Sequence, residues 1–316
     1  MTTVVPKLLA RWLVRSTLLV LLVSALTFVL VSLTPGDPAR TILGQSATQE
    51  QYEALRLQMG LDEPLLTRYG SWLADALHGD LGASLFSGEA VTSLIGQRLG
   101  VTLTLIVGGV LAAGLLGVAL GVVSARSTGV LARVVDVASL VGSAIPPFWL
   151  GLVLSAVFAV GLRLVPVVGY TSPAVDPAAW FLSILLPVAT LALAGTAIVA
   201  KQTRDAMRDE LGKDYVLVLR SHGATEWTVQ IKHALRNAGV PVVTVLGVLL
   251  IGLLGGTVLV ESVFSLPGLG GLAVTSTLRH DLPVIQGVTV LFAVVVVAVN
   301  LLVDLVNAWI NPKVSA

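Results

Sequence analysis

Uncharged apolar segments recur along the chain and are separated by polar segments of uneven length. A helix needs about 20 apolar residues to cross a bilayer, and six segments approach or exceed this length without any Asp, Glu, Lys or Arg. They are residues 16–33, 99–125, 137–162, 177–200, 237–260 and 282–303. The pattern predicts an all-α integral membrane protein with six transmembrane helices.

The N-terminal part, residues 1–33, has basic residues followed by an apolar run, a combination that also occurs in secretory signal peptides. Its run ends in "TPGDP" and not in a small-x-small cleavage site, so we expect a retained first span. Pro146 and Pro147 interrupt the third segment. Lipid tolerates such breaks only where neighbouring helices or a water-filled cavity satisfy the backbone groups that are left unpaired.

The composition agrees with a membrane protein, with 55% hydrophobic residues, 12% charged residues and a mean hydropathy of +0.93. The formal charge of +1 gives no indication of nucleic-acid binding, because the cations lie between the apolar segments. The chain has no cysteine, which excludes disulfides, thiolate metal sites and cysteine nucleophiles.

Lys and Arg are distributed unequally between the two sides of the predicted membrane. If the segments alternate in direction, 13 of the 19 Lys and Arg residues fall on one side, together with both ends of the chain. Cytoplasmic loops carry an excess of Lys and Arg. Both termini are therefore expected in the cytoplasm.

The long outer segment, residues 34–98, has the features of a small helical extracytoplasmic insertion. "TQEQYEALRLQMG" contains a capping box at Thr48 and Gln51 and ends at Gly60. "EPLLTRYGSWLADALHG" places Pro64 at a helix start. One face of this second helix would carry Leu65, Tyr69, Trp72, Leu73 and Ala76. We expect two short amphipathic helices, with a mobile loop as the alternative.

The inner segment, residues 201–236, is longer than a simple connection requires. "AKQTRDAMRDELG" extends the fourth apolar helix and places Lys201 and Asp205 four apart on one face, as far as Gly212. Asp214 is expected to cap a short helix, "YVLVLRSH". Gly223 would end it, and a second helix would begin at Thr225 and carry an apolar face. That face consists of Trp227, Ile231, Ala234, Leu235 and Ala238.

The short helix in this inner segment carries five consecutive apolar residues, 215–219, beside Arg220. A monomer rarely exposes such a run, so it could dock into the groove of a soluble partner. It could equally pack on the ends of the membrane helices of its own chain. Spacing leaves both explanations open.

The stretch "DYVLVLRSHGATEWTVQIKHALRNAGVPVVT" closely resembles the cytoplasmic EAA loop of the permease subunits of binding-protein-dependent ABC importers, in the dipeptide, oligopeptide and nickel permease subfamily. The matching positions are Asp214, Tyr215, Arg220, Gly223, Ala224, His233, Ala234, Leu235, Arg236, Asn237 and Pro241. The E-A-A positions are Leu217, Val218 and Leu219 here, so the family's acidic residue is missing. The motifs "LTPGDPA", "GLDEP", "GDLGAS", "PPFWLG", "ESVFSLPGLG", "NLLVDL" and "NPK" also resemble this subfamily, in the same order.

The resemblance implies a type I ABC importer permease fold in the plasma membrane of a prokaryote, as a multi-pass protein. It further implies a homologous second permease subunit in a heterodimer, two cytoplasmic ABC ATPase subunits and an extracytoplasmic substrate-binding protein. The residues 99–316 would form a five-helix core with the coupling loop 201–236. This chain has no G-x-x-x-x-G-K-[ST] motif, so ATP and Mg are expected on the partner ATPases, with no cofactor and no catalytic residue in this chain.

The resemblance also assigns residues to the expected sites. ATPase coupling would involve Asp214, Tyr215, Leu217, Val218, Leu219, Arg220, His222, Gly223 and Ala224. Support for the coupling loop would come from His233, Leu235, Arg236 and Asn237. Their position at the outer ends of the spans, and not the resemblance, makes Glu261, Pro267, Gly268 and Arg279 candidates for an outer gate or a contact with the binding protein. A capped helix end explains Glu261 equally well, and Arg279 could instead be a simple interface anchor.

The expected cargo is a di- or oligopeptide, with nickel or another small solute as the alternative. The apolar segments carry no formal charge, and His78, His222, His233 and His280 all lie outside them, so no metal site is expected in the membrane. A membrane scaffold or receptor that recruits a cytoplasmic partner is an alternative from another class. An intramembrane enzyme would need a motif such as H-E-x-x-H or G-x-S-x-G, and neither occurs.

Overall fold

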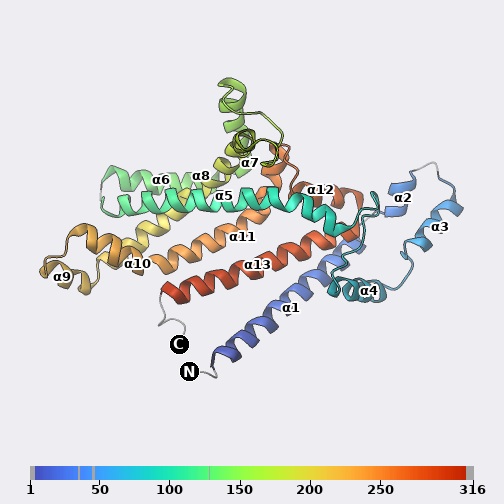
Figure 1. Cartoon of the computed structure of the whole chain (residues 1–316), viewed down its shortest axis with the longest axis horizontal. Helices are drawn as coiled ribbons and strands as arrows, with labels where there is room; N and C mark the ends of the chain where they lie inside the picture. Colours follow the sequence, from blue (N-terminus) through green and yellow to red (C-terminus); the bar gives the residue numbers. More distant parts are fainter. Residues whose placement is uncertain (1–3, 35, 45–46, 128, 311–316) are drawn as a thin grey trace. The chain divides into compact units, whose positions relative to one another are not determined.

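The computed structural model describes residues 4–34, 36–44, 47–127 and 129–310, and its regular elements in these ranges are helices (Figure 1). The one β interaction among them is an isolated antiparallel bridge between Ala83 and Ala90. The predicted all-α fold class is confirmed. The chain divides into two compact units, residues 1–100 with 268–297 and residues 101–267 with 298–316. We call them the first and second unit.

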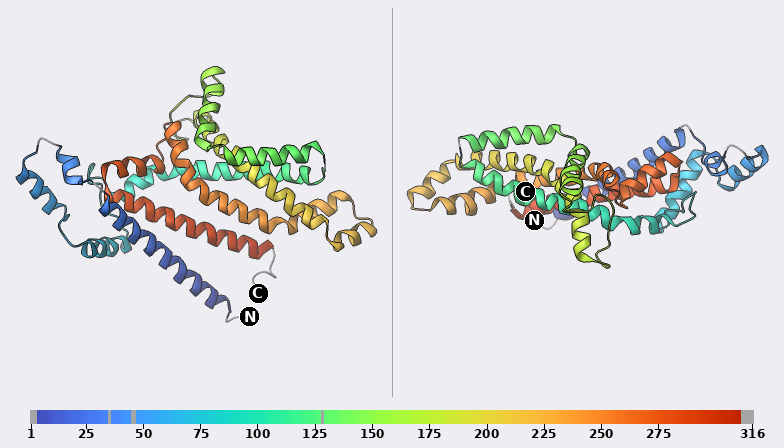
Figure 2. Two further views of the ribbon diagram at one scale, coloured as in Figure 1. Left: turned by 180° about the vertical axis from the view of Figure 1, so that it is seen from behind. Right: turned by 90° about the horizontal axis from the view of Figure 1, so that it is seen from above.

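Within the described ranges, five helices are long and apolar enough to cross a membrane. They are α1 (Val4–Leu33), α5 (Val91–Ala125), α8 (Pro177–Leu211), α11 (Gly239–Val263) and α13 (Leu282–Ile310), which can be followed in Figure 1 and Figure 2. Each covers most or all of one predicted segment. In α8 the extension beyond the apolar part is charged, and Lys201 bonds Asp205 at 2.8 Å, as the sequence predicts.

The third predicted segment, residues 137–162, is not one straight helix. α6 (Val130–Ala144) is followed by α7 (Pro147–Leu154), which continues as the π-helical η1 (Ser155–Gly161), and the two parts are bent by 104°. Ile145 and Pro146 both precede a proline, which disfavours the helical conformation, and their ψ angles are 123° and 133°. Counted as one broken span, the pair brings the number of spans to the predicted six.

Short helices make up much of the first unit. They are α2 (Pro38–Leu43), α3 (Gln49–Gln58), α4 (Leu65–Leu77) and α12 (Leu269–Arg279). The structure confirms α3, with both hydrogen bonds of its capping box, and it confirms α4 after Pro64. The sequence pattern did not predict α2 or α12. The latter contains two glycines and three hydroxyl residues, which have low helix propensity.

The predicted apolar face of α4 packs against α1 in the first unit. The Tyr69 ring meets Phe28 edge-on at 5.4 Å and stacks with Trp72 at 6.2 Å, and its hydroxyl lies 2.7 Å from Oγ of Ser24. Nε2 of Gln286 donates to the carbonyl of Ser24 at 2.8 Å and joins α13 to the same helix. A separate core cluster of this unit consists of Val91, Leu94, Ile95, Leu269, Leu272, Val284 and Val288.

In the second unit α5 and α8 approach each other closely along glycines of α5. A Cβ atom at Gly117 would lie 2.6 Å from Cβ of Val199, and one at Gly121 would lie 2.5 Å from Cβ of Thr203. No side chain larger than hydrogen fits at these two positions. Small residues between membrane helices usually serve to let the helix backbones approach closely. A core cluster then joins α5, α8 and the segment before α11. It consists of Val122, Ala206, Met207, Ala234 and Ala238.

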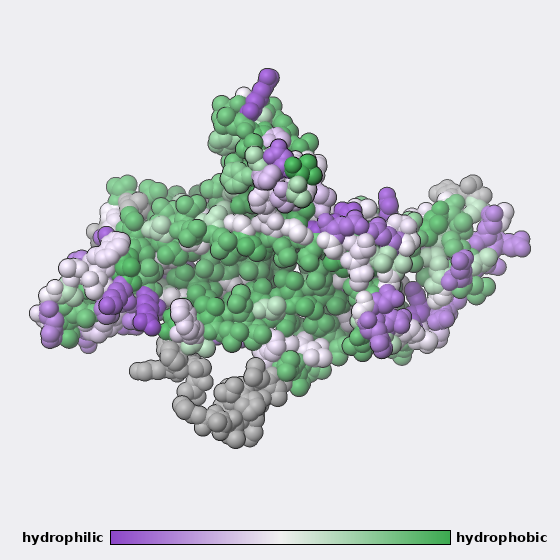
Figure 3. Space-filling view, in the orientation of Figure 1, coloured by the Kyte–Doolittle hydropathy of each residue, from purple (hydrophilic) through white to green (hydrophobic). Residues whose placement is uncertain are grey.

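The surface of the long helices is apolar. Figure 3 shows hydrophobic side chains covering α5, α8 and α11, while hydrophilic residues gather towards the ends of the helices and on the short ones. Leu111, Leu115 and Leu116 of α5 are more than half exposed. An exposed apolar surface of this extent marks contact with lipid or with another membrane protein.

Candidate functional site

The candidate site lies on the polar connection between α8 and α11. After Gly212 the chain forms α9 (Asp214–Ser221), and after a turn it forms η2 (Thr228–Ala234) and α10 (Leu235–Asn237), as seen in Figure 1. The two predicted short helices are therefore present. Asp214, however, does not cap α9. Lys213 holds the extended cap position, and Asp214 is already helical, so its carboxylate lies in the first turn, where it interacts favourably with the helix dipole.

The apolar residues of α9 divide between two faces. Val216 is fully buried in its own chain, whereas Leu217 and Val218 are 64% and 55% exposed. The two explanations offered by the sequence thus apply to different residues. Val216 packs on its own chain, whereas Leu217 and Val218 are exposed and accessible to another protein. The half-buried side chain of Leu219 lies between these extremes.

Tyr215 connects α9 to the helices on either side of it. Its hydroxyl donates to Oε2 of Glu210 at 3.1 Å and accepts from Nδ2 of Asn237 at 3.3 Å. Burial, together with the hydrogen bond to Glu210, raises the pKa of Tyr215 above its ordinary value. The phenol therefore stays neutral at physiological pH. Lys213 also pairs with Glu210, so the start of α9 is tied to the end of α8.

Arg220 is paired within the chain by a residue that the sequence analysis did not single out. Its Nε donates to Oε1 of Glu226 at 2.7 Å, and its second terminal nitrogen donates to Oε2 at 3.1 Å. The hydrogen bond from Arg220 lowers the pKa of Glu226, and the pKa of Arg220 is correspondingly raised. Both groups stay charged at neutral pH. The pair spans the turn between two helices, so no helical period could have predicted it.

Gly223 ends α9 in the left-handed conformation, with φ +78°. The amide of Gly223 donates to the carbonyl of Arg220 at 3.0 Å, and the amide of Ala224 donates to that of Leu219 at 3.1 Å. Other residues rarely adopt this conformation, so glycine allows the sharp reversal. Nδ1 of His222 donates to the carbonyl of Val218 at 2.8 Å, which adds to the end of the helix.

The second short helix anchors the loop 201–236 to α5 and α8. Leu235 packs with the buried cluster that contains Met207 and Ala234. His233 is half-buried and Arg236 is exposed. Trp227 shares the predicted apolar face, since it lines one cavity with Ile231 and Leu235. It is itself 66% exposed, and the Arg126 guanidinium lies 5.9 Å from its ring centre.

The four outer residues occupy different environments. Glu261 is only 1% exposed and accepts a hydrogen bond from Oγ1 of Thr102 at 2.6 Å. It lies in the last turn of α11 and is not a surface contact in this conformation. Pro267 is exposed and Gly268 is buried. Arg279 is exposed at the end of α12, where its guanidinium lies 5.8 Å from the ring centre of Phe86.

In the part of the chain that the structure describes, no group of three or more His, Asp or Glu residues could hold a metal ion. The distinctive feature is instead a short helix, anchored by buried and paired residues, that presents apolar side chains on a polar connection. The structure is therefore that of a membrane protein with several spans and an exposed apolar helix on one of its polar connections.

Comparison with known proteins defines the class further. The family model described as "Binding-protein-dependent transport system inner membrane component" matches residues 117–316, and the N-terminal membrane component model of the same transport systems matches residues 5–106. The chain belongs to this family. It is thus a multi-pass inner membrane component of a transporter, and the family implies ATPase and substrate-binding protein partners.

Relatives of similar length extend over almost the whole chain. A probable peptide ABC transporter permease protein of Sinorhizobium fredii is 39% identical over 305 residues, which cover 96% of this chain and 97% of the relative. A putative peptide transport system permease protein of Brucella abortus is 37% identical, with 93% and 94% covered. A glutathione transport system permease protein of Escherichia coli is 38% identical over 297 residues, again with 93% and 94% covered.

Proposed function

We propose that this chain forms half of the pathway of an ATP-driven peptide importer and that α9 transmits the movement of a cytoplasmic ATPase to it. The other half of the pathway is a homologous second permease subunit. Two ATPase subunits bind ATP and Mg, and each receives the coupling helix of one permease. A binding protein delivers the cargo on the outer side.

The exposure of Leu217 and Val218 on α9 is the observation that carries this proposal. The two side chains stand on a polar connection in which Val216 and Tyr215 hold the helix to its own chain. An anchored helix with an exposed apolar tip suits docking into a groove of a soluble protein. Because α9 is tied to the end of α8 and to the segment before α11, its displacement moves both membrane helices as rigid bodies.

The missing acidic residue of the E-A-A pattern fits this arrangement. Leu217 stands at the acidic position and is exposed, so it offers apolar surface where the family's glutamate would offer charge. The charge of Arg220 is satisfied by Glu226. We therefore infer that this coupling helix engages its ATPase mainly through apolar contacts.

The orientation follows from the distribution of Lys and Arg. With α9 in the cytoplasm, both termini are cytoplasmic, and the connection between α1 and α5 is extracytoplasmic. The assignment places the basic segment 201–236 on the inner side and the helices α2, α3 and α4 on the outer side.

A peptide is the cargo that suits the chain best. Two of the relatives above are named as peptide permeases and one as a glutathione permease. The predicted apolar segments carry no formal charge, which suits cargo with varied side chains. Nickel is the second candidate, but it needs imidazole or carboxylate ligands that these segments do not provide.

Reconstitution of the assembled transporter in lipid nanodiscs tests the proposal. ATP hydrolysis is measured while the binding protein is added without cargo, with di- and oligopeptides, or with Ni²⁺. We expect stimulation by the peptide-loaded binding protein and none by the Ni²⁺-treated one. Stimulation by Ni²⁺ alone would contradict the cargo assignment, and no dependence on the binding protein would contradict the importer.

A further inference from the structure

A cavity of about 240 Å³ lies in the first unit, between the start of α5, the segment 84–87 and α12, and is lined by both polar and apolar side chains. We call it the arginine pocket. Its lining combines two guanidinium groups with a group of hydroxyl side chains. These residues are Arg98 and Arg279, with Ser84, Ser87, Thr275 and Ser276.

The two arginines of this pocket lack a carboxylate partner among the residues that the structure describes. Neither Arg98 nor Arg279 makes a salt bridge within 4 Å to any residue in the described ranges, and Nε of Arg98 is buried there without a hydrogen-bond partner. A buried donor that makes no hydrogen bond is costly, so such a group invites an acceptor from outside the chain. Arg279 is exposed and leaves the pocket accessible.

The one carboxylate in the lining is already used inside the chain. Asp281 is 4% exposed, and it accepts from Oγ of Ser84 at 2.5 Å and from the amide of Leu85 at 3.1 Å. These bonds hold the segment 84–87 to the start of α13. The pocket therefore keeps an excess of positive charge.

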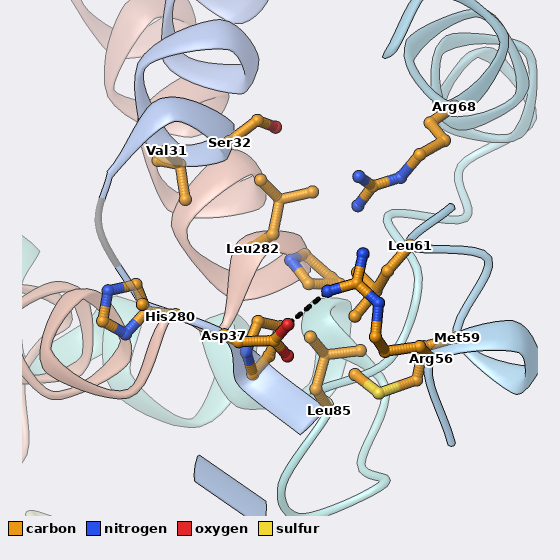
Figure 4. Close-up of a pocket in the computed structure, with 13 residues that line it drawn as sticks. Val31, Ser32, Asp37, Arg56, Met59, Leu61, Arg68, Leu85, His280 and Leu282 are labelled. Carbon is orange, nitrogen blue, oxygen red and sulfur yellow. Dashed lines mark hydrogen bonds and ion pairs between the residues drawn. The ribbon is translucent and has the colours of Figure 1, made fainter. Parts of the chain in front are cut away.

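A second cavity of about 220 Å³ in the same unit contains an arginine that is paired with carboxylates of the same chain. It is lined by Asp37, Arg56, Arg68 and His280, among others, and Figure 4 shows Arg56 bonded to Asp37. Arg56 also pairs with Asp62 at 2.7 Å. Burial alone would raise the pKa of Asp37, but hydrogen bonds from Tyr52 and Ala39 and the charge of Arg56 lower it. Arg56 of this cavity is thus paired inside the chain, whereas Arg68 lies over the Phe28 ring without an ion pair in the described ranges. In the arginine pocket both arginines lack such a pair.

The chemistry of the arginine pocket selects a carboxylate. A guanidinium forms two parallel hydrogen bonds with a carboxylate, and the hydroxyls can donate to the same group. The volume lies below the range of about 300–1,000 Å³ that is typical of whole small-molecule ligands. It suits a single side chain, such as the anchor residues that fill pockets at protein interfaces.

We propose that the arginine pocket receives an aspartate or glutamate side chain of the extracytoplasmic binding protein. This inference rests on the proposed function, which puts the pocket on the outer side of the membrane, where the binding protein docks. The pocket thereby adds Arg98 and the hydroxyl residues to Arg279, which is one of the four predicted outer residues. The carboxylate would bridge Arg98 and Arg279 and supply the acceptor that Nε of Arg98 lacks.

The test measures the affinity of the peptide-loaded binding protein for the assembled transporter in nanodiscs of phosphatidylcholine. We expect Arg98→Gln and Arg279→Gln each to weaken binding about tenfold. Arg279→Lys should lie between these variants and the native protein, because lysine keeps the charge but loses the bidentate geometry. The matched control is Arg40→Gln, an exposed arginine over Tyr52 outside this pocket, which should leave the affinity unchanged.

Three outcomes would overturn the inference. Native affinity in a correctly assembled Arg279→Gln transporter would show that the pocket does not contact the binding protein. A defect that appears only when anionic lipid is added would assign the pocket to a lipid headgroup, and a defect that disappears with amidated peptide would assign it to the cargo. The proposed function is tested separately, by stimulation of ATP hydrolysis in the native transporter. If the binding protein does not stimulate the native transporter, the proposed function is wrong. Native-like binding by the variants contradicts only the role of the arginine pocket.

Discussion

The α9 helix and the arginine pocket differ in whether their arginines are paired inside the chain. On α9 and its turn, Arg220 is paired with Glu226, and the exposed side chains are Leu217 and Val218. The arginine pocket instead offers two guanidinium groups that have no carboxylate partner in the described ranges. Apolar burial favours a lasting attachment, whereas complementary charge favours rapid and selective encounter. The exposed apolar side chains of α9 therefore suit a permanent partner, and the arginine pocket suits a transient one.

The largest expected effect comes from placing a charge on the apolar surface. Leu217→Asp would bury a carboxylate without a partner in the interface with the ATPase, at a cost on the order of 3 kcal/mol or more, equivalent to about a 100-fold loss of affinity. Peptide uptake into proteoliposomes should fall accordingly, and the ATPase should dissociate on purification. Leu217→Met keeps an apolar side chain and serves as the control. Normal uptake by Leu217→Asp would break the comparison.

A smaller effect is expected from the turn that follows α9. Gly223→Val forces a β-branched residue into φ +78°, at a cost of roughly 1–3 kcal/mol. We expect uptake per ATP hydrolysed to fall about tenfold, while membrane insertion is retained. Gly79→Val is the matched control, because Gly79 has φ +88° and open space around it but lies in the outer segment. Equal uncoupling by both variants would show a general loss of stability.

Ionic strength should affect binding at the arginine pocket but not binding at α9. A rise in ionic strength from about 0.1 M to 1 M shortens the Debye length from about 10 Å to 3 Å. The affinity of the binding protein for the transporter should fall several-fold, whereas the ATPase subunits should stay attached. Light scattering and binding measurements on the same preparation check both. Release of the ATPase at high salt, with the binding protein unaffected, would reverse the assignment.

The smallest effect is expected at the exposed ion pair. Arg220→Gln and Glu226→Gln should each lower uptake less than about threefold, because exposed ion pairs contribute little to stability. The folded-state pKa of Glu226 is lowered, so the contribution of the pair is present at neutral pH and is lost only as the pH falls through that lowered value. Uptake by the native protein and Arg220→Gln should thus have the same profile between about pH 6 and pH 8. A large, pH-dependent loss would make Arg220 a direct contact.

Hydrophobic patterning predicted the long helices well, because about 20 uncharged residues in a row have few alternatives. The prolines Pro146 and Pro147 indicated a break in the third segment, but the pattern could not predict its geometry, since a proline pair in a membrane segment can bend a helix or end it. The pattern also missed α12, whose helix depends on burial of Leu269 and Leu272 in a cluster assembled from distant segments.

The candidate site was predicted to a similar degree. The position of α9 and its end at Gly223 followed from the sequence and from the family resemblance. Which of the apolar residues are exposed did not, because Val216 and Leu217 have the same polarity and only packing distinguishes them. The partner of Arg220 lies across a turn, and the surroundings of Arg98 come from segments that are far apart along the chain.

Photo-cross-linking from α9 tests the central claim most directly. The chain has no cysteine, so Val218→Cys can be labelled uniquely with a benzophenone maleimide in the assembled transporter. Leu115→Cys, an exposed apolar position on the membrane helix α5, is the control. We predict that the Val218 probe attaches to the ATPase subunit and that the Leu115 probe attaches to lipid or to a membrane subunit. Attachment of the Val218 probe only to lipid or to this chain itself would contradict the account.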